Sequence, residues 1–306
     1  HKRIWRDLKD HWARKQRAYI QHYYGASILS DAQTKALEKV ICVGSHANCH
    51  LHFTRGEFGA NSVTRGGGAL NQRERNKAHY HANRACNSIS IEKLTQVIRN
   101  SLLVTVESAA QRAKAGSLVA GKVWQNLYLH EDRVFQRKAA DEIGNLSVDV
   151  LLDASGSQMD RQETIAAQAY ILAESLTRCR IPVRVVSFCT NRNFTIFHLL
   201  RDYDSLEKNE AIFHYYASGC NRDGLAIRTA QYLLRDSTAE NKTLIVISDG
   251  KPLEPQGFPE HGLNPDAYMY ADSAAVSDVA AEVRKGICEG SRILCVFTGA
   301  EEDIPL

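Results

Sequence analysis

The sequence predicts an α/β fold, in which a mostly parallel sheet is flanked by helices and preceded by a mainly helical N-terminal region. Two observations lead to this fold class. Strand-like and helix-like segments alternate through the second half of the chain, which is typical of parallel sheets with crossover helices on both faces. Several strand-like segments are also continuous apolar runs, such as TLIVIS at residues 243–248, as expected of strands that are buried on both faces.

The elements of the second half can be assigned in order along the chain. Ile165, Ala169, Leu172 and Leu176 recur at the spacing of one helical face and indicate a helix. The strand that follows residues 182–189 is expected to run antiparallel, because the turn before it is too short for a crossover. We expect strands over residues 147–152, 182–189, 193–200, 243–248 and 292–298, and helices over residues 161–179, 206–216, 225–234 and 274–286.

The first half has a less regular pattern. Its N-terminal segment is basic and is expected to be helical, residues 91–114 are a long helix candidate, and residues 54–68 form a Gly-rich linker. We therefore divide the chain into a mainly helical basic region, residues 1–115, and a C-terminal domain with its own N-terminal extension, residues 116–306.

Composition limits the class of protein. With 44% hydrophobic and 24% charged residues, a packed core is expected and global disorder is not. No run of about 18 apolar residues occurs, so we expect no membrane span. The charged N-terminus does not resemble a signal peptide, and the eight scattered cysteines are expected to be reduced. Together these features predict a cytoplasmic protein.

The two halves carry opposite charge. Residues 1–145 hold 23 Lys and Arg against 12 Asp and Glu, whereas residues 146–306 hold 15 against 23. We expect the two parts either to bind different partners or to dock on each other. For the basic N-terminal helix we prefer docking on the acidic domain over nucleic-acid binding, so nucleic acid is not an expected partner.

Short oxygen-bearing side chains follow the predicted strands at residues 147–152 and 243–248 and occur in the segment SGCNRDG at residues 218–224. Because ligands of open α/β sheets bind beyond the carboxyl ends of the strands, we expect these side chains to converge. Oxygen ligands suit a hard divalent cation, Mg²⁺ or Mn²⁺. The alternative is that these residues only cap helices and form turns. The candidate ligands are Asp153, Ser155, Ser157, Asn221 and Asp249, with Asp223 as an alternative in the central segment.

These residues resemble the metal-ion-dependent adhesion site of the von Willebrand factor A (VWA) domain, over about residues 145–306. The resemblance implies a six-stranded Rossmann-like sheet and a bound Mg²⁺. The family normally supplies a threonine from the central loop, where this chain has Asn221. An Asn oxygen is also a neutral ligand, but Asp223 lies two residues further on and would compete for the ion.

Further segments resemble the nitric-oxide-reductase activation protein group, which is related to the VWA subunit of aerobic cobaltochelatase. The resemblance implies a non-enzymatic, chaperone-like adaptor that works with a MoxR-type AAA+ ATPase on a protein client. Two alternatives stay open: a VWA subunit of a metal chelatase acting on a tetrapyrrole, and an RNA-binding VWA scaffold. The matching segments are GSLVAGKVWQNLYLHEDRVFQRK (116–138), SVDVLLDASGSQ (147–158), RDYD (201–204), NRDGLAIR (221–228) and SDGKP (248–252).

Two other features carry predictions. Residues 116–138 include Trp124 and Phe135 and are too apolar for a solvated tether, so we expect them to pack on the domain. Residues 42–53 concentrate cysteine and histidine at a spacing that fits no standard zinc finger, so we favour a mixture of core and surface residues over a metal site. The cysteines and histidines concerned are Cys42, His46, Cys49, His50 and His52.

Overall fold

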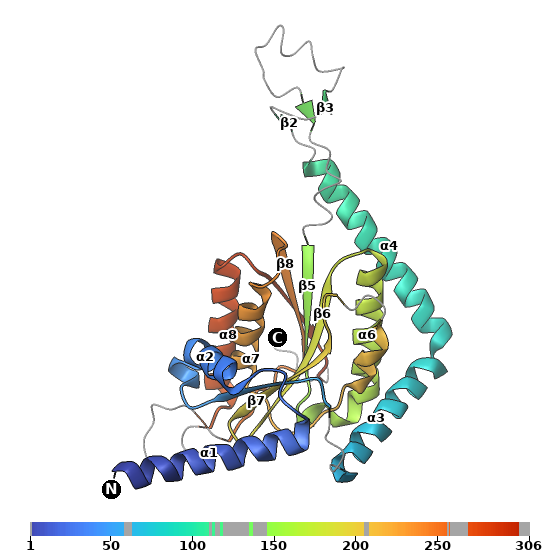
Figure 1. Cartoon of the computed structure of the whole chain (residues 1–306). Coiled ribbons are helices and arrows are strands. Elements are labelled where there is room, and N and C mark those ends of the chain that lie inside the picture. The colour runs from blue at the N-terminus through green and yellow to red at the C-terminus, as the bar shows by residue number, and fades with distance from the viewer. Residues whose placement is uncertain are drawn as a thin grey trace.

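The computed structural model describes residues 2–57, 63–109, 112–113, 117–118, 135–136, 146–204, 208–255, 257 and 269–299. A six-stranded mixed sheet forms its centre, with helices on both faces (Figure 1). The α/β fold class predicted from the sequence is confirmed. The sheet order is β1 (His50–Thr54), β7 (Phe194–Arg201), β6 (Val183–Asn191), β5 (Leu146–Asp153), β8 (Asn241–Ser248) and β9 (Arg292–Phe297).

Four strands, β5, β6, β8 and β9, run parallel, and β7 runs antiparallel to β6, as the short turn between them predicts. That turn contains Arg192 and Asn193, both with positive φ, which matches the twist of a two-residue hairpin. The apolar run of β5 is buried from Ser147 to Asp153 because β6 and β8 cover its edges and helices cover its faces.

The helices divide between the two faces of the sheet. Helix α6 covers one face together with α3 and α4, and α7, α8 and α2 lie on the other (Figure 1). The helices are α1 (Lys2–Tyr24), α2 (Asp31–Ile41), α3 (Val63–Ala82), α4 (Arg84–Ala109), α6 (Gln162–Arg178), α7 (Asp223–Leu234) and α8 (Asp272–Cys288). Shorter 3₁₀ turns are η1 (Gly44–His46), η5 (Gly156–Arg161) and η6 (Asn209–His214).

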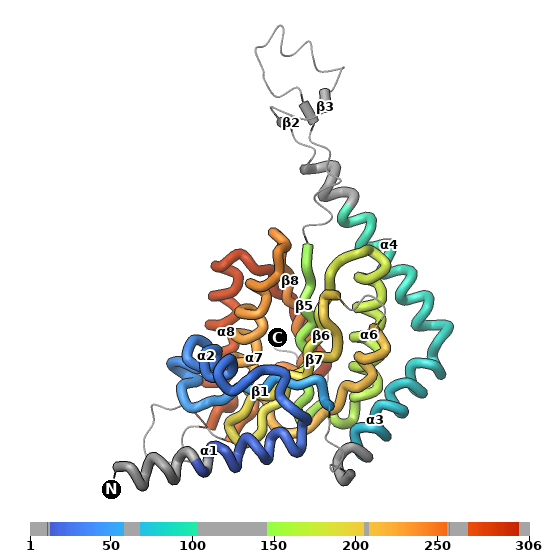
Figure 2. The backbone as a smooth tube through the Cα atoms, viewed as in Figure 1, coloured from blue at the N-terminus to red at the C-terminus, as the bar shows by residue number. Residues whose placement is uncertain are grey.

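The N-terminal region contributes directly to the central sheet. Strand β1 pairs in parallel with β7 from His50 opposite Phe194 to Thr54 opposite His198 (Figure 2). On β1, the Phe53 ring stacks on that of Phe197 at 5.1 Å. The sequence interpretation had not placed a strand of this region in the sheet.

Helices α3 and α4 pack against α6 on the opposite face. The ring centroid of Tyr80, on α3, lies 4.7 Å from that of Tyr170 and 5.4 Å from that of Phe213. Ion pairs also cross between the two halves of the chain, since Arg75 lies 2.7 Å from Glu163 and Lys77 lies 3.4 Å from Glu210. Parts of the basic first half thus dock on the acidic second half, one of the two arrangements that the charge asymmetry suggested.

Several elements differ in extent from the sequence interpretation. Helix α3 begins at Val63, so the second part of the Gly-rich stretch is helical, and α4 begins at Arg84. The helix expected at residues 206–216 is the 3₁₀ turn η6 over its described part. Short strands β2 (Arg112–Ala113), β3 (Ser117–Leu118) and β4 (Phe135–Gln136) form a separate small sheet.

The boundary near residue 115 and most of residues 116–138, including Trp124, lie outside the described residues, so the packing of that segment stays a prediction. None of the helices in the described ranges combines the length and hydropathy that crossing a bilayer requires.

Candidate metal centre

Asp153 is the last residue of β5 and lies fully buried at the carboxyl edge of the sheet. Its Oδ1 accepts a hydrogen bond from the Ser155 backbone N–H at 2.9 Å, and its Oδ2 accepts one from the Ser248 hydroxyl at 3.0 Å. Gln158 donates a longer bond to the same Oδ2 at 3.4 Å. The carboxylate is thus oriented by its own loop and by the end of β8. Oδ1, which accepts one of these bonds, keeps a further lone pair for a ligand.

The two serines after β5 lie side by side. Their hydroxyl oxygens are 3.0 Å apart, and Ser155 is buried whereas Ser157 is exposed. The backbone N–H of Gly156 donates to the Gly219 carbonyl at 2.9 Å, and that of Ser218 donates to the Ala154 carbonyl at 2.7 Å. These two bonds fasten the serine loop to residues 218–223, which we call the central loop.

The central loop ends in Asp223, the first residue of α7, which is 5% exposed. Among the residues that the structure describes, its Oδ1 is buried and has no hydrogen-bond partner. Burial raises the pKa of Asp223 well above its ordinary value, and the neighbouring charges of Asp153 and Asp249 raise it further, while Asn221 and Ser248 oppose this rise. A buried carboxylate oxygen that lacks a donor is costly.

Asn221, the other central-loop candidate, has its side-chain amide engaged elsewhere. Its Nδ2 donates to the Lys251 carbonyl at 3.2 Å, and its Oδ1 accepts from the Leu253 backbone N–H at 3.0 Å. The backbones of Asn221 and Leu253 also pair. Asn221 therefore fastens the central loop to the segment after β8. Of the two candidates, Asp223 is the one that offers an oxygen without a partner among the described residues.

Asp249 follows β8 and is 3% exposed, with its Oδ1 accepting from the Lys251 backbone N–H at 3.2 Å. Burial raises the pKa of Asp153, and the charge of Asp249 adds to this rise. The charges of these neighbouring carboxyl groups, which come from three loops, thus disfavour the ionised forms of Asp153 and Asp223. Such a set, together with the two serine hydroxyls, fits a hard divalent cation, whose charge would reverse the repulsion.

Sequence reasoning missed three residues that hold this arrangement in place. Ser248 and Gln158 donate to Asp153, and the Tyr215 hydroxyl donates to the Asp153 carbonyl. Ser248 directly precedes Asp249 at the end of an apolar strand, so its position is a usable signal. Tyr215 lies 62 residues from Asp153 and has no comparable signal in the sequence.

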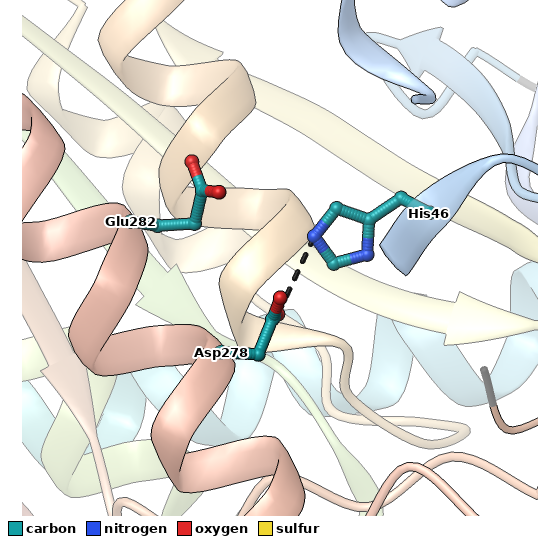
Figure 3. A group of neighbouring side chains, drawn as sticks. All are labelled: His46, Asp278 and Glu282. Carbon is teal, nitrogen blue, oxygen red and sulfur yellow. Dashed lines mark ion pairs between the residues drawn. The ribbon is translucent and has the colours of Figure 1, made fainter. Parts of the chain in front are cut away.

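A second cluster, His46, Asp278 and Glu282, brings one ligand atom from each side chain within 4.8 Å of the others (Figure 3). Its chemistry does not fit a metal. Arg222 Nε donates to His46 Nδ1 at 3.0 Å, so the neutral ring carries its proton on Nε2, 3.4 Å from Asp278 Oδ2. Burial lowers the pKa of His46 to about 2, which keeps the ring neutral. A metal-bound histidine instead donates from its second nitrogen, so we assign this cluster to a polar network.

The remaining cysteines and histidines of residues 42–53 point to different partners. His50 Nδ1 lies 3.3 Å from Glu38, and His52 Nε2 lies 3.0 Å from the Gly25 carbonyl. Cys42 and Cys49 are buried, and burial raises the pKa of each thiol to about 12. Within the described part of the chain, none of these four side chains joins a group that could hold a metal, which agrees with a mixture of core and surface residues.

Comparison with known proteins adds a family for part of the chain. Residues 134–198, which include β5, α6, β6 and part of β7, match the model described as the cobalamin biosynthesis protein CobT VWA domain. No curated protein matches the sequence.

Solved structures with VWA-like folds are also similar. The pilus adhesin SpaC from Lactobacillus rhamnosus GG has 13% identity over 50% of this chain and a TM-score of 0.39, and the chain covers 24% of its length. The vWF domain of the type V pili tip protein Mfa5 from Porphyromonas gingivalis has 17% identity over 39% of this chain and 42% of its own, with a TM-score of 0.31. BatB from Bacteroides thetaiotaomicron has 14% identity over 52% of this chain and 93% of its own, with a TM-score of 0.31.

The family match and the strand order β7-β6-β5-β8-β9, with β7 antiparallel, agree on the fold. The chain carries a VWA-type α/β domain, to which its N-terminal region adds the edge strand β1.

Proposed function

We propose that the carboxyl edge of the sheet binds Mg²⁺ or Mn²⁺. The observation that carries this proposal is the buried Asp223 Oδ1, which lacks a hydrogen-bond partner in the described residues and sits beside two further buried carboxylates. The residues that would hold the ion are Asp153, Ser155, Ser157 and Asp223, with Asp249 contributing directly or through water. Asn221, predicted as a ligand from the sequence, would fix the central loop next to them.

The proposed role of the ion is docking. When bound, the cation supplies an open coordination position that accepts a carboxylate from another protein. Two large apolar side chains are exposed close to this position in sequence: Met159 in η5 is 48% exposed, and Leu253 in the segment fastened to Asn221 is 47% exposed. A partner would therefore present an acidic side chain surrounded by apolar ones.

In this proposal the protein is a non-enzymatic, cytoplasmic adaptor that engages a MoxR-type AAA+ ATPase or its client. Its task would be to activate a metalloenzyme such as nitric oxide reductase or to help insert its metal. The support is the resemblance of residues 116–138, 147–158 and 221–228 to the nitric-oxide-reductase activation group, together with the site described above.

The second candidate function is a VWA subunit of a metal chelatase acting on a tetrapyrrole. The match of residues 134–198 to the VWA domain of a cobalamin biosynthesis protein favours it. Both functions use the same edge of the sheet, and they differ in the partner that the site would hold.

Affinity capture with the full chain tests these functions. Wild type, Asp153→Ala and Asp160→Ala are compared in Mg²⁺ and in EDTA, and the retained proteins are identified by mass spectrometry. Asp160 is an exposed carboxylate in η5 and serves as the matched control. We expect wild type and Asp160→Ala to retain an AAA+ ATPase in Mg²⁺ only, and Asp153→Ala to lose it. Capture of chelatase subunits would favour the second function, and capture that is unaffected by EDTA and by Asp153→Ala would refute both.

A further inference from the structure

The N-terminal region holds the central loop, residues 218–223, from two sides. On one side lies Tyr24, the last residue of α1. Its hydroxyl accepts hydrogen bonds from Asn191 Nδ2 at 3.0 Å and from Ser218 Oγ at 3.5 Å. Gly219 sits beneath this contact with a φ of +74°, and a Cβ there would come within 2.7 Å of the Thr190 carbonyl oxygen. The first half of the loop is thus closely packed and requires glycine.

On the other side lies Arg222, the residue between the two central-loop candidates, Asn221 and Asp223. The Arg222 side chain is only 1% exposed, which is unusual for a charged residue. Two of its donors go to the N-terminal region: Nε donates to His46 Nδ1 at 3.0 Å, and Nη2 donates to the Ser45 carbonyl at 2.7 Å. Other donors go to the Glu254 carboxylate and to the Gly257 carbonyl, the latter at 3.0 Å.

The contacts of His46 continue through a ring of side chains that reaches both neighbours of Asp223, and the step from His46 to Asp278 in this ring is a contact without a hydrogen bond. From His46, Nε2 lies 3.4 Å from Asp278 Oδ2, and that oxygen accepts the Tyr270 hydroxyl at 2.7 Å. Tyr270 in turn accepts the Gly224 backbone N–H at 3.0 Å. These contacts therefore connect the two residues on either side of Asp223: they begin at Arg222 and end at Gly224.

We propose that His46 is a positioning residue for the cation site: through Arg222 on one side and Asp278–Tyr270–Gly224 on the other, it fixes the backbone that carries Asp223. The inference rests on the proposed cation site. A carboxyl group with one oxygen, Oδ1, that lacks a donor would tend to rotate toward one. Fixing its backbone on both sides keeps the oxygen available for the ion, in the way that outer contacts orient metal ligands.

The alternative is that the ring only stabilises the fold. In that case the loss of His46 lowers thermal stability but leaves the affinity of a folded protein for the cation unchanged. A positioning role predicts a loss of affinity of about 10- to 100-fold, the usual cost of removing an outer contact of a metal ligand.

The chain offers variants that separate the contacts of His46. His46→Leu removes both the contact with Arg222 and the contact with Asp278. His46→Asn keeps an acceptor near the position of Nδ1 and so preserves the contact with Arg222. Tyr270→Phe is a milder change that removes only the hydroxyl joining Asp278 to Gly224. His50→Leu is the matched control, because His50, on β1, pairs with Glu38 of α2 and not with a residue of the ring.

The experiment is calorimetric titration of each full-length protein with Mn²⁺, with the melting temperature in EDTA as the measure of folding. We expect His46→Leu and Tyr270→Phe to bind Mn²⁺ about 10- to 100-fold more weakly, His46→Asn to recover most of the affinity, and His50→Leu to match wild type. If wild type binds no Mn²⁺, the cation site itself is refuted. If wild type binds while folded His46→Leu and Tyr270→Phe bind equally well, the positioning role alone is overturned. Should His46→Leu not fold, Tyr270→Phe decides.

Discussion

Replacing Asp223 by Asn should stabilise the metal-free protein. Burial, then the charge of Asp153, raises the pKa of Asp223 well above 3.8. A carboxyl group whose pKa is raised on folding costs stability as pH rises from its unfolded value through its folded value. Asparagine has nearly the same shape and carries no charge at any of these pH values. The advantage of Asp223→Asn in EDTA should therefore be small near pH 4 and grow toward neutral pH.

The magnitude follows from the surroundings of Asp223 Oδ1, which is buried and has no hydrogen-bond partner within the described ranges. Leaving a neutral group of this kind unsatisfied costs about 1–3 kcal/mol and a charged one more. Asparagine keeps an unpaired polar atom there but removes the extra cost of the charge, which we take to be of the same size, about 1–3 kcal/mol. For a domain of this size each kcal/mol shifts the melting temperature by about 2–4 °C, so we expect a gain of about 2–12 °C in EDTA. Added Mg²⁺ acts in the opposite sense: at about 100 times its dissociation constant it would stabilise wild type by about 2.7 kcal/mol, and the variant by less.

The assay is thermal unfolding of both proteins in EDTA and in Mg²⁺, from about pH 5 to about pH 8. The variant should melt higher than wild type in EDTA, and the difference should shrink or reverse in Mg²⁺. Asp160→Asn, an exposed carboxylate in the neighbouring η5, should change neither value. The reasoning is refuted if Asp223→Asn is less stable than wild type in neutral EDTA, or if Mg²⁺ raises both melting temperatures equally.

Three further predictions concern the site and the fold. Ser155→Ala should lose Mg²⁺-dependent partner capture with little change in the EDTA melting temperature; a parallel loss of both would mean that the ion is structural. Phe53→Ala should cost about 3–5 kcal/mol in denaturant unfolding, because Phe53 is 6% exposed and stacks on Phe197; a neutral effect would show that β1 contributes little to the domain. Arg184→Met should cost about 3–5 kcal/mol, because it leaves Asp149 buried without the guanidinium that donates to it at 3.1 Å; a stability equal to that of wild type would contradict this.

The strands that were predicted correctly share one property, a strong local signal. Short continuous apolar runs such as residues 243–248 are typical of buried strands, and the short turn before β7 determines the direction of β7. Strand β1 gave no such signal. Its sequence, HLHFT, is only five residues long, and histidine alternates with apolar residues in it. Its partner β7 begins more than 140 residues after the start of β1. Nothing local determines that pairing.

In the candidate site, too, only the features with a local signal could be predicted from the sequence. The carboxyl ends of parallel strands meet at one edge, so the convergence of Asp153 and Asp249 could be expected from the strand assignments alone. The preference for Asp223 over Asn221 that we propose could not, because it rests on the Leu253 backbone N–H, which donates to the Asn221 oxygen from 32 residues away. Arg222 and His46 are in contact although they lie 176 residues apart, in the two regions into which we divided the sequence.

The hydrogen bonds around Asp223 explain how its oxygen stays without a donor. Buried carboxylates usually capture the nearest donor, and several donors lie close to this one. Ser248 donates to Asp153, the Asn221 amide donates to Lys251, and the Gly224 backbone N–H donates to Tyr270. Asn221 and Ser248 also interact with the Asp223 carboxyl group and lower its pKa, but within the described residues neither donates to Oδ1. We therefore expect the metal-free protein to carry the cost of an unpaired Asp223 Oδ1, which a divalent cation bound there would relieve.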